Sequence, residues 1–294
     1  MSKNIAALLL ALAVSVSAGA SERLVVAGGS LTELIFALGA GQNVVGVDET
    51  TAWPPETDKL PHIGAWMQLS SESILSLRPT TFITWQDAKP QIVFEQLRKL
   101  KLNVLTLPRI PATVDQMYAN IQTLANALAR PQQGEVLIAN LQQRLDAIAK
   151  SSAQKSHPVR AMFILSAGGS LPQVAGAGSV ADTILKMAGA NNIARHRQYQ
   201  SYSTEAMIAA NPDVIVATTQ MTQGDPNALK AIPGITLTSA WKNKRIVIID
   251  QALILGMGPR ITEAVEQLHH QFWPEPGQNG ELFFENMSDV NNET

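Results

Sequence analysis

A capped helix start followed by a proline occurs twice in this chain, at one spacing. Ser70-Ser71-Glu72 precedes Pro79, and Ser203-Thr204-Glu205 precedes Pro212, so both features recur after 133 positions (203 minus 70 and 212 minus 79). A serine next to a carboxylate is typical of a helix N-terminus. Because only two copies exist, the repeat favours two similar lobes over a solenoid. Two lobes imply a cleft between them.

The length and composition suit a folded two-domain protein without a strong electric field. The chain has 294 residues, of which 46% are hydrophobic and 16% are charged, enough to bury one or two cores. Its formal net charge is −2. A nucleic-acid partner normally requires a strongly basic surface, so we expect none.

The N-terminus has the pattern of a cleavable export signal. Lys3 precedes an apolar run from Ile5 to Val16, which is too short to span a bilayer, and Ala18 and Ala20 have the spacing of a signal peptidase site. We predict a signal peptide over residues 1–20; the alternative is an N-terminal anchor helix. No later stretch is apolar for about 18 residues.

The sequence has no cysteine. Disulfides, thiolate metal sites and cysteine nucleophiles are therefore excluded, and so is a lipid-modified cysteine at the processing site. We expect a protein that is free in the periplasm, without a direct membrane anchor.

The order of elements predicts an α/β fold with two doubly wound lobes joined by one long rigid helix. Expected strands lie at 23–27, 44–47, 80–84 and 103–107, and again at 160–165, 213–217 and 245–249. Expected helices include 113–128, 180–188 and 262–272, while 174–179 is predicted to be a turn. Ser30 and Glu33 have the spacing of a capping box at the start of the first helix.

These elements predict five segments. After the signal peptide come an N-terminal lobe (21–127), a bridging helix (128–155), a C-terminal lobe (156–274) and a loose tail (275–294). Pro131 is suited to the first turn of the bridging helix. A helix of about 20 residues would span roughly 30 Å, which is enough to reach from one lobe to the other.

No motif in the chain predicts an enzyme. A nucleophile elbow and a H-E-x-x-H motif are both missing, and the five histidines are scattered along the sequence. Gly28-Gly29-Ser30 lacks the full spacing of a dinucleotide-binding loop, so we interpret it as a tight turn. We expect no catalytic residues.

Glu72 and Glu205 occupy matching positions in the two copies of the repeat. The helix dipole favours a carboxylate in the first turn, which explains either residue alone. Two equivalent carboxylates on two similar lobes instead favour docking onto a symmetric partner that carries paired arginines.

The chain resembles the substrate-binding proteins of ABC importers, in the group that serves the permeases for haem, cobalamin and siderophores. The resemblance covers residues 22–273 and rests on Gly-Ser-Leu-Thr-Glu-Leu-Ile-Phe-Ala-Leu-Gly (29–39), on both glutamate-containing helix starts, and on the long helix between the lobes. It implies a monomer in which Glu72 and Glu205 meet arginines of an inner-membrane permease dimer, itself coupled to an ATPase.

Within this group the chain is most similar to periplasmic haem-binding proteins. Proteins of that group typically carry the motif Gly-Tyr-x-Arg-x-Leu-Ser-x-Glu in the first lobe, where the tyrosine ligates the haem iron. Some carry an additional histidine in the motif Leu-x-His-Gly-Gly of the second lobe. Here the two ligand positions are Ala65 and Ala167, and Met67 replaces the arginine. Alanine has no lone pair, so this chain has no metal ligand at either position. We hypothesise engineered ligand deletions; the alternative is a divergent member with other cargo.

The resemblance also implies a set of residues that line the cleft and contact haem as transported cargo. Trp66 and Met67 are expected to pack on the porphyrin, although Trp66 equally suits packing within its lobe. Tyr199 and Tyr202 are candidate substitute ligands or packing residues, and Arg260 is expected to meet a propionate or to form a surface salt bridge. The full predicted contact set is Ala65, Trp66, Met67, Ala167, Gly168, Gly169, Tyr199, Tyr202 and Arg260. Cobalamin or a ferric siderophore is the alternative cargo, and an exported enzyme the more distant alternative.

Overall fold

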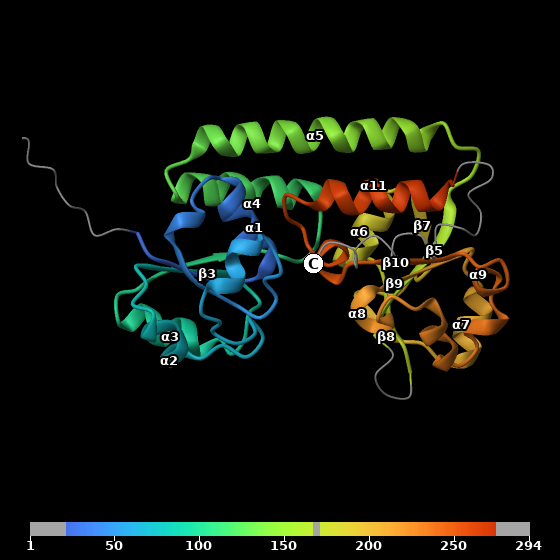
Figure 1. The fold of residues 1–294 in the computed structure, drawn as a ribbon, viewed down its shortest axis with the longest axis horizontal. Coiled ribbons are helices and arrows are strands. Elements are labelled where there is room, and N and C mark those ends of the chain that lie inside the picture. The colour runs from blue at the N-terminus through green and yellow to red at the C-terminus, as the bar shows by residue number, and fades with distance from the viewer. Residues whose placement is uncertain (1–21, 167–170, 275–294) are drawn as a thin grey trace, which may run out of the picture.

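The computed structural model describes residues 22–166 and 171–274 and shows two α/β lobes side by side beneath one long helix (Figure 1). The predicted signal peptide (1–20) and tail (275–294) lie outside the described residues. The fold class is therefore the predicted one, while the predicted segment boundaries stay predictions.

The N-terminal lobe contains a four-stranded sheet in the order β2-β1-β3-β4. Every pairing in this sheet is parallel, and β1 is buried along its whole length, as expected of strands covered on both faces. The strands are β1 (Leu24–Ala27), β2 (Val44–Val47), β3 (Thr81–Trp85) and β4 (Asn103–Leu107). The helices of this lobe are α1 (Gly29–Ala37), α2 (Ser71–Ser76), α3 (Ile92–Lys99) and α4 (Val114–Ala127), with short 3-10 turns at Gly41–Asn43 and Pro55–Lys59.

The C-terminal lobe contains a larger, mixed sheet in the order β10-β9-β5-β6-β8, with β7 also paired to β5. Its strands are β5 (Val159–Ser166), β6 (Gln173–Ala175), β7 (Ala190–Asn192), β8 (Tyr199–Ser201), β9 (Val214–Thr218) and β10 (Ile246–Ile249). Strand β6 runs antiparallel to both β5 and β8. The prediction of a turn over 174–179 was therefore wrong at its start, because Val174 and Ala175 are buried in β6.

Short helices surround this second sheet. They are α6 (Val180–Met187), α7 (Thr204–Ala210), α8 (Thr219–Thr222), α9 (Ser239–Lys242), α10 (Gln251–Ile254) and α11 (Ile261–Phe272), with 3-10 turns at Pro226–Ala231 and Ile235–Leu237. Phe163 and Phe272 are among the largest fully buried side chains of this lobe.

Helix α5 (Pro131–Ala153) bridges the two lobes, with Pro131 in its first turn as predicted. It lies along α4 on one lobe and along α11 on the other (Figure 1). A side chain at Gly134 would lie only 2.6 Å from the Cβ of Ala125, so glycine allows α5 to approach α4 closely. On the other side, Arg144 pairs with Glu266 of α11 at 2.7 Å. Both ends of α5 are thus fixed to a lobe.

The predicted capping box at the first helix is wrong. Helix α1 begins at Gly29, and its N-cap, Gly28, makes no side-chain cap hydrogen bond. The backbone carbonyl of Gly28 accepts from the amides of Leu31 and Thr32 instead. Glu33 is therefore not required as a cap, and its carboxyl group is buried elsewhere.

Candidate ligand-binding cleft

The turn that contains Ala65 is closed by its own backbone. The amide of Gln68 donates to the carbonyl of Ala65 at 2.8 Å, so Trp66 and Met67 occupy the corner of the turn. Gly64 precedes it with a φ of +87°, a conformation that favours glycine. Met67 is 60% exposed, so its thioether is available to a molecule outside the lobe.

Trp66 is held from several sides. Its amide donates to Asp48 Oδ2 at 3.3 Å, and its carbonyl accepts from the amide of Lys89 at 2.9 Å. The guanidinium of Arg109 lies over the indole ring, 4.9 Å from its centre, a cation–π contact. Arg109 in turn pairs with Asp87. The turn is therefore a rigid part of the lobe.

Asp48 anchors this turn from below. Its side chain is fully buried and accepts from the hydroxyl groups of Thr50 at 2.8 Å and Thr51 at 3.1 Å. Burial raises the pKa of Asp48, while the hydrogen bonds from Thr50, Gly28, Thr51 and Trp66 act in the opposite direction. The donors to this carboxyl group, two hydroxyl groups and two backbone amides, are all neutral.

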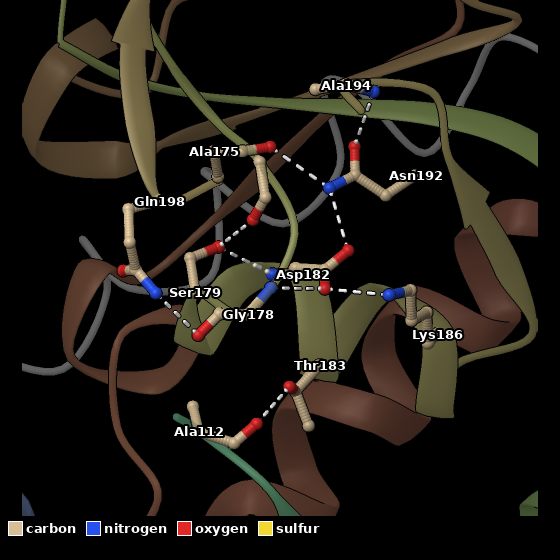
Figure 2. Close-up of polar contacts among 11 residues, drawn as sticks. Ala112, Ala175, Gly178, Ser179, Asp182, Thr183, Lys186, Asn192, Ala194 and Gln198 are labelled. Atoms are coloured by element: carbon tan, nitrogen blue, oxygen red, sulfur yellow. Dashed lines mark hydrogen bonds and ion pairs between the residues drawn. The ribbon is translucent and has the colours of Figure 1, made fainter. Parts of the chain in front are cut away.

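A second buried aspartate, Asp182, anchors the facing part of the C-terminal lobe (Figure 2). It accepts from the amide of Gly178 at 3.0 Å, from Asn192 Nδ2 at 2.9 Å and from Lys186 Nζ at 2.8 Å. Ser179 caps α6 by accepting from the amide of Asp182. This network fixes the turn between β6 and α6.

The two lobes meet directly at that turn. The hydroxyl group of Thr183 donates to the carbonyl of Ala112 at 2.6 Å, a bond drawn in Figure 2, and the amide of Ala112 donates to the carbonyl of Gly178 at 3.4 Å. A cavity of about 20 Å³ lies beside this contact and is lined from both lobes, by Arg109 and Val180 among others. A space of this size holds about one water molecule. A large ligand must therefore bind outside this cavity.

Tyr199 lies across the lobe boundary from Arg109. Burial raises the pKa of Tyr199 to about 12, against the opposing influence of the Arg109 charge and of a hydrogen bond with Ser179. Its phenol is thus kept neutral beside the guanidinium that covers Trp66. This tyrosine belongs to strand β8 of the C-terminal lobe.

Glu72 and Glu205 are exposed at the starts of α2 and α7. Ser70 accepts from the amide of Ser73 at 3.3 Å and Ser203 from the amide of Ala206 at 3.2 Å, so both predicted serine caps are confirmed. Hydrogen bonds from its own amide and from Ser203 lower the pKa of Glu205. In Figure 1 both helices lie on the side away from α5, one in each lobe.

Most of the sequence matches one family model. A profile described as periplasmic binding protein matches residues 24–253. The chain belongs to the periplasmic binding protein family.

Three relatives of this binding protein show the range of the family. The apo structure of the periplasmic haem-binding protein RhuT from Roseiflexus sp. RS-1 is 34% identical, with a TM-score of 0.81, and the match covers 86% of this chain and 100% of that one. The periplasmic haem-binding protein HutB of Vibrio cholerae is 32% identical, with a TM-score of 0.78, covering 86% and 100%. A vitamin B12-binding protein of Yersinia pestis (strain Pestoides F) is 26% identical over 272 residues, 89% of this chain and 95% of the relative. These relatives are solute-binding proteins.

Of the predicted contact set of this binding protein, Ala65, Trp66 and Met67 share one turn. Tyr199 belongs to β8 of the other lobe and is close enough to Arg109 for the charge of Arg109 to oppose the rise in its pKa. Ala167, Gly168 and Gly169 lie outside the described residues. Tyr202 instead lies within its own lobe, with its hydroxyl group 3.4 Å from His196 Nδ1 and the two ring centres 5.3 Å apart.

Arg260 is occupied by other residues. Its Nε donates to Glu263 Oε2 at 3.0 Å, its Nη1 lies 3.8 Å from Glu33 Oε1, and its guanidinium lies 4.8 Å from the ring centre of Trp53. The ion pair with Glu263 corresponds to the predicted salt bridge. The predicted contact with a propionate stays a prediction.

Asp48 and Arg109 were missed by sequence reasoning, because neither lies in a recognisable motif and both contact Trp66 from other parts of the chain. Glu33 was predicted only as part of a capping box, and its contact with Arg260 was missed. Over residues 22–166 and 171–274, no group of three histidine, aspartate or glutamate side chains is placed to hold a metal ion. In the same ranges no helix is long and apolar enough to cross a membrane.

Proposed function

We propose that this protein captures haem in the periplasm and delivers it to an inner-membrane ABC permease. The observation that supports the proposal is the comparison across relatives: four periplasmic haem-binding proteins are 32–34% identical, whereas vitamin B12-binding proteins are 24–26% identical. A further haem-binding protein, HmuT, shares the fold at 20% identity. Haem is then transported cargo and not a catalytic cofactor. Residues 1–20 serve as the export signal, and the mature protein is a monomer.

The turn at Ala65, Trp66 and Met67 supports this cargo. Ligand sites for large cofactors are mostly apolar with a few fixed polar groups. Here an exposed methionine stands on a turn that is held by Asp48, with Arg109 beside it. A flat apolar ring with carboxylate groups at its edge fits such a wall, because the ring packs on the thioether and the carboxylate meets the cation.

The two alanines cannot coordinate haem iron, so iron coordination at these positions adds nothing to the affinity for haem. Ala65 has only a methyl group, and we extend the same reasoning to Ala167. Affinity then comes from the burial of apolar surface, at about 25 cal/mol per Å². We propose that the two alanines replace iron ligands, either by engineering or by divergence.

Delivery uses the two matched helix starts. Glu72 and Glu205 are exposed, capped by equivalent serines, and carried by helices on one side of the molecule (Figure 1). Two carboxylates held in this way suit bidentate pairing with arginines on a two-fold symmetric permease, which is coupled to its ATPase.

Titration of the purified protein with haem, cobalamin and a ferric siderophore tests the cargo. We expect haem to quench tryptophan fluorescence and the quenching to saturate at a defined molar ratio of haem to protein. The absorbance changes should be weaker than those of an iron-ligated complex. Met67→Ala should weaken haem binding, whereas Met221→Ala, in the C-terminal lobe, should not. Tighter binding of cobalamin or of the siderophore than of haem would overturn the assignment.

A further inference from the structure

Helices α3 and α9, one in each lobe, end in the same kind of turn. At α3 the amide of Lys101 donates to the carbonyl of Arg98 at 2.9 Å. At α9 the amide of Lys244 donates to the carbonyl of Trp241 at 3.0 Å. In both turns the next amide along the chain reaches the preceding carbonyl, at 3.1 Å and 2.8 Å. These are the two bonds of a Schellman motif. We call residues 98–101 and 241–244 the lysine turns.

Lysine is an unusual residue at the position it takes in these turns. The φ angle is +60° at Lys101 and +53° at Lys244, in the left-handed region that favours glycine and disfavours a residue with a Cβ. Helices α1 and α6, which pack elsewhere in the lobes, end with Gly39 and Gly189 at the same position. Glycine would form the lysine turns with less strain, so folding alone does not explain the two lysines.

The lysine turns belong to the layer of helices that carries the two proposed docking glutamates. Ile74 of α2 and Leu97 of α3 pack in one hydrophobic cluster of the N-terminal lobe. Met207 of α7 and Ala240 of α9 pack in one cluster of the C-terminal lobe. Helices α1, α4, α5, α6 and α11 contribute to a different cluster. Figure 1 shows α2, α3 and α7 on the side away from α5. Each lysine turn thus follows a helix that shares a layer with a docking helix.

The lysines of these turns are available to an outside partner. Lys101 and Lys244 are both exposed, and within residues 22–166 and 171–274 neither takes part in an ion pair. Residues 92–101 carry three cations and one carboxylate, Glu95, so their net charge is +2 (3 minus 1). Residues 239–244 carry two lysines and no acidic residue, which is also +2. Both ends of this layer therefore attract anions.

Exposed apolar side chains accompany the cations. Leu100 lies between two lysines in the N-terminal turn and is 64% exposed. Ile92 of α3, Ile208 of α7 and Leu237, just before α9, are exposed in the same layer. A leucine flanked by lysines suits the surface of a lipid bilayer, where the apolar side chain reaches the acyl boundary and the ammonium groups stay among the headgroups. The C-terminal turn has Asn243 in place of Leu100 and offers charge alone.

We propose that the two lysine turns contact anionic lipid headgroups of the inner membrane beside the permease. This inference rests on the proposed delivery function, because docking through α2 and α7 turns their layer towards the membrane that holds the permease. The contact is peripheral and reversible, and it needs no anchor, since each lysine near an anionic surface strengthens binding only about fivefold. It keeps the protein close to the membrane in which its permease lies.

Cosedimentation of the mature chain with lipid vesicles tests this contact in the absence of haem and permease. We expect binding to vesicles that contain phosphatidylglycerol and none to vesicles of phosphatidylcholine alone, and the binding should be lost at about 0.5 M salt. Lys101→Asn and Lys244→Asn should each weaken it about fivefold. Asparagine tolerates left-handed backbone, as Asn211 does after α7, so both variants should keep their turns.

Two further variants serve as controls. Lys150→Gln, on α5, removes one exposed charge outside this layer and should bind vesicles like the wild type. Leu100→Asn gives the N-terminal turn the asparagine of the C-terminal one, and it should weaken binding without changing its dependence on salt. Circular dichroism establishes that each variant is folded.

Equal binding to both kinds of vesicle would overturn the proposal, as would undiminished binding when both lysines are replaced. Binding that requires the permease in neutral vesicles would assign the turns to acidic side chains of the permease and would also overturn it. Haem titration of the lysine variants should be unchanged, because the proposed haem contacts lie at residues 65–67. A failure of the membrane contact is therefore distinguished from a failure of the cargo assignment.

Discussion

The two lobes are alike at the starts of α2 and α7 and differ in the strands of their sheets. Helices α2 and α7 both follow a serine cap, carry an exposed glutamate in the first turn and precede a buried parallel strand. The sheets, however, are four-stranded and parallel in one lobe and six-stranded and mixed in the other. The additional antiparallel strands, β6 and β8, bring Tyr199 to the lobe boundary.

This difference separates two kinds of contact. A feature present in both lobes suits a partner with two-fold symmetry, which is the expectation for docking on a permease dimer. A feature present in one lobe only suits an asymmetric occupant of the cleft, which is the expectation for cargo. The matched glutamates and the unmatched turn of Trp66 and Met67 should therefore respond to different experiments.

Reversal of both matched charges should have the largest effect. Glu72→Arg combined with Glu205→Arg places cations against the arginines of the permease, and we expect haem-dependent uptake to fall by at least about 100-fold, because like charges at an interface cost several kcal/mol. Haem binding by the purified variant should be unchanged. Normal uptake would show that the matched helix starts are not docking sites.

Glu33→Gln should change how stability depends on pH. The pKa of Glu33 lies at about 7 when folded, against an ordinary 4.5. Because the folded protein binds this proton more tightly than the unfolded chain, the contribution of Glu33 to stability is fully present below pH 4.5 and is lost as pH rises towards 7, by up to about 3 kcal/mol. Urea unfolding at several pH values should show this fall in the wild type and a flatter profile in Glu33→Gln. Identical profiles would contradict the assignment.

The two buried aspartates should differ when each is changed to asparagine. Asp182 receives an amide, an Asn192 NH₂ and an ammonium group, all of which are donors that an asparagine NH₂ would oppose, so we expect Asp182→Asn to cost about 2 kcal/mol. Asp48 accepts from the amides of Trp66 and Gly28, but its Oδ1 is met by the hydroxyl groups of Thr50 and Thr51, which can also accept from an NH₂ placed there, so Asp48→Asn should cost about half as much. Equal losses in urea unfolding would remove this distinction between the lobes.

Arg109→Gln should change haem binding and leave the fold intact. It removes the cation over Trp66 and beside Tyr199, and we expect haem to bind about tenfold more weakly, which corresponds to about 1.4 kcal/mol. Arg144→Gln is the matched control, because Arg144 pairs with Glu266 between α5 and α11, away from the cleft. A weaker affinity in both variants would indicate a general loss of structure.

The elements that the sequence predicted are those with local causes. Ser70 and Ser203 cap their helices through bonds to residues three positions away, and Pro131 starts α5 because a proline suits the first turn. Glu33 also had a local explanation, as a cap, but its burial beside Arg260 prevailed. That contact joins residues 227 positions apart (260 minus 33), which no local pattern encodes.

The short strands of the C-terminal lobe were not predicted, because they too depend on contacts between distant residues. Strands β6, β7 and β8 have only three residues each, too few to show an alternating pattern. Strand β8 exists because β6 pairs with it, and the position of Tyr199 follows from that pairing. A loop at residues 64–68 was predictable from the sequence, whereas the residues that hold it, Asp48 and Arg109, were not.

A spectroscopic haem titration of this chain beside the variant Ala65→Tyr with Ala167→His tests the central claim most directly. The account predicts that both proteins bind haem and that only the restored variant shows the Soret shift of an iron-ligated complex, because only it supplies lone pairs at the two positions. If the restored variant binds haem without a Soret shift, or binds none, the two alanines are not vacated ligand positions and the haem assignment fails.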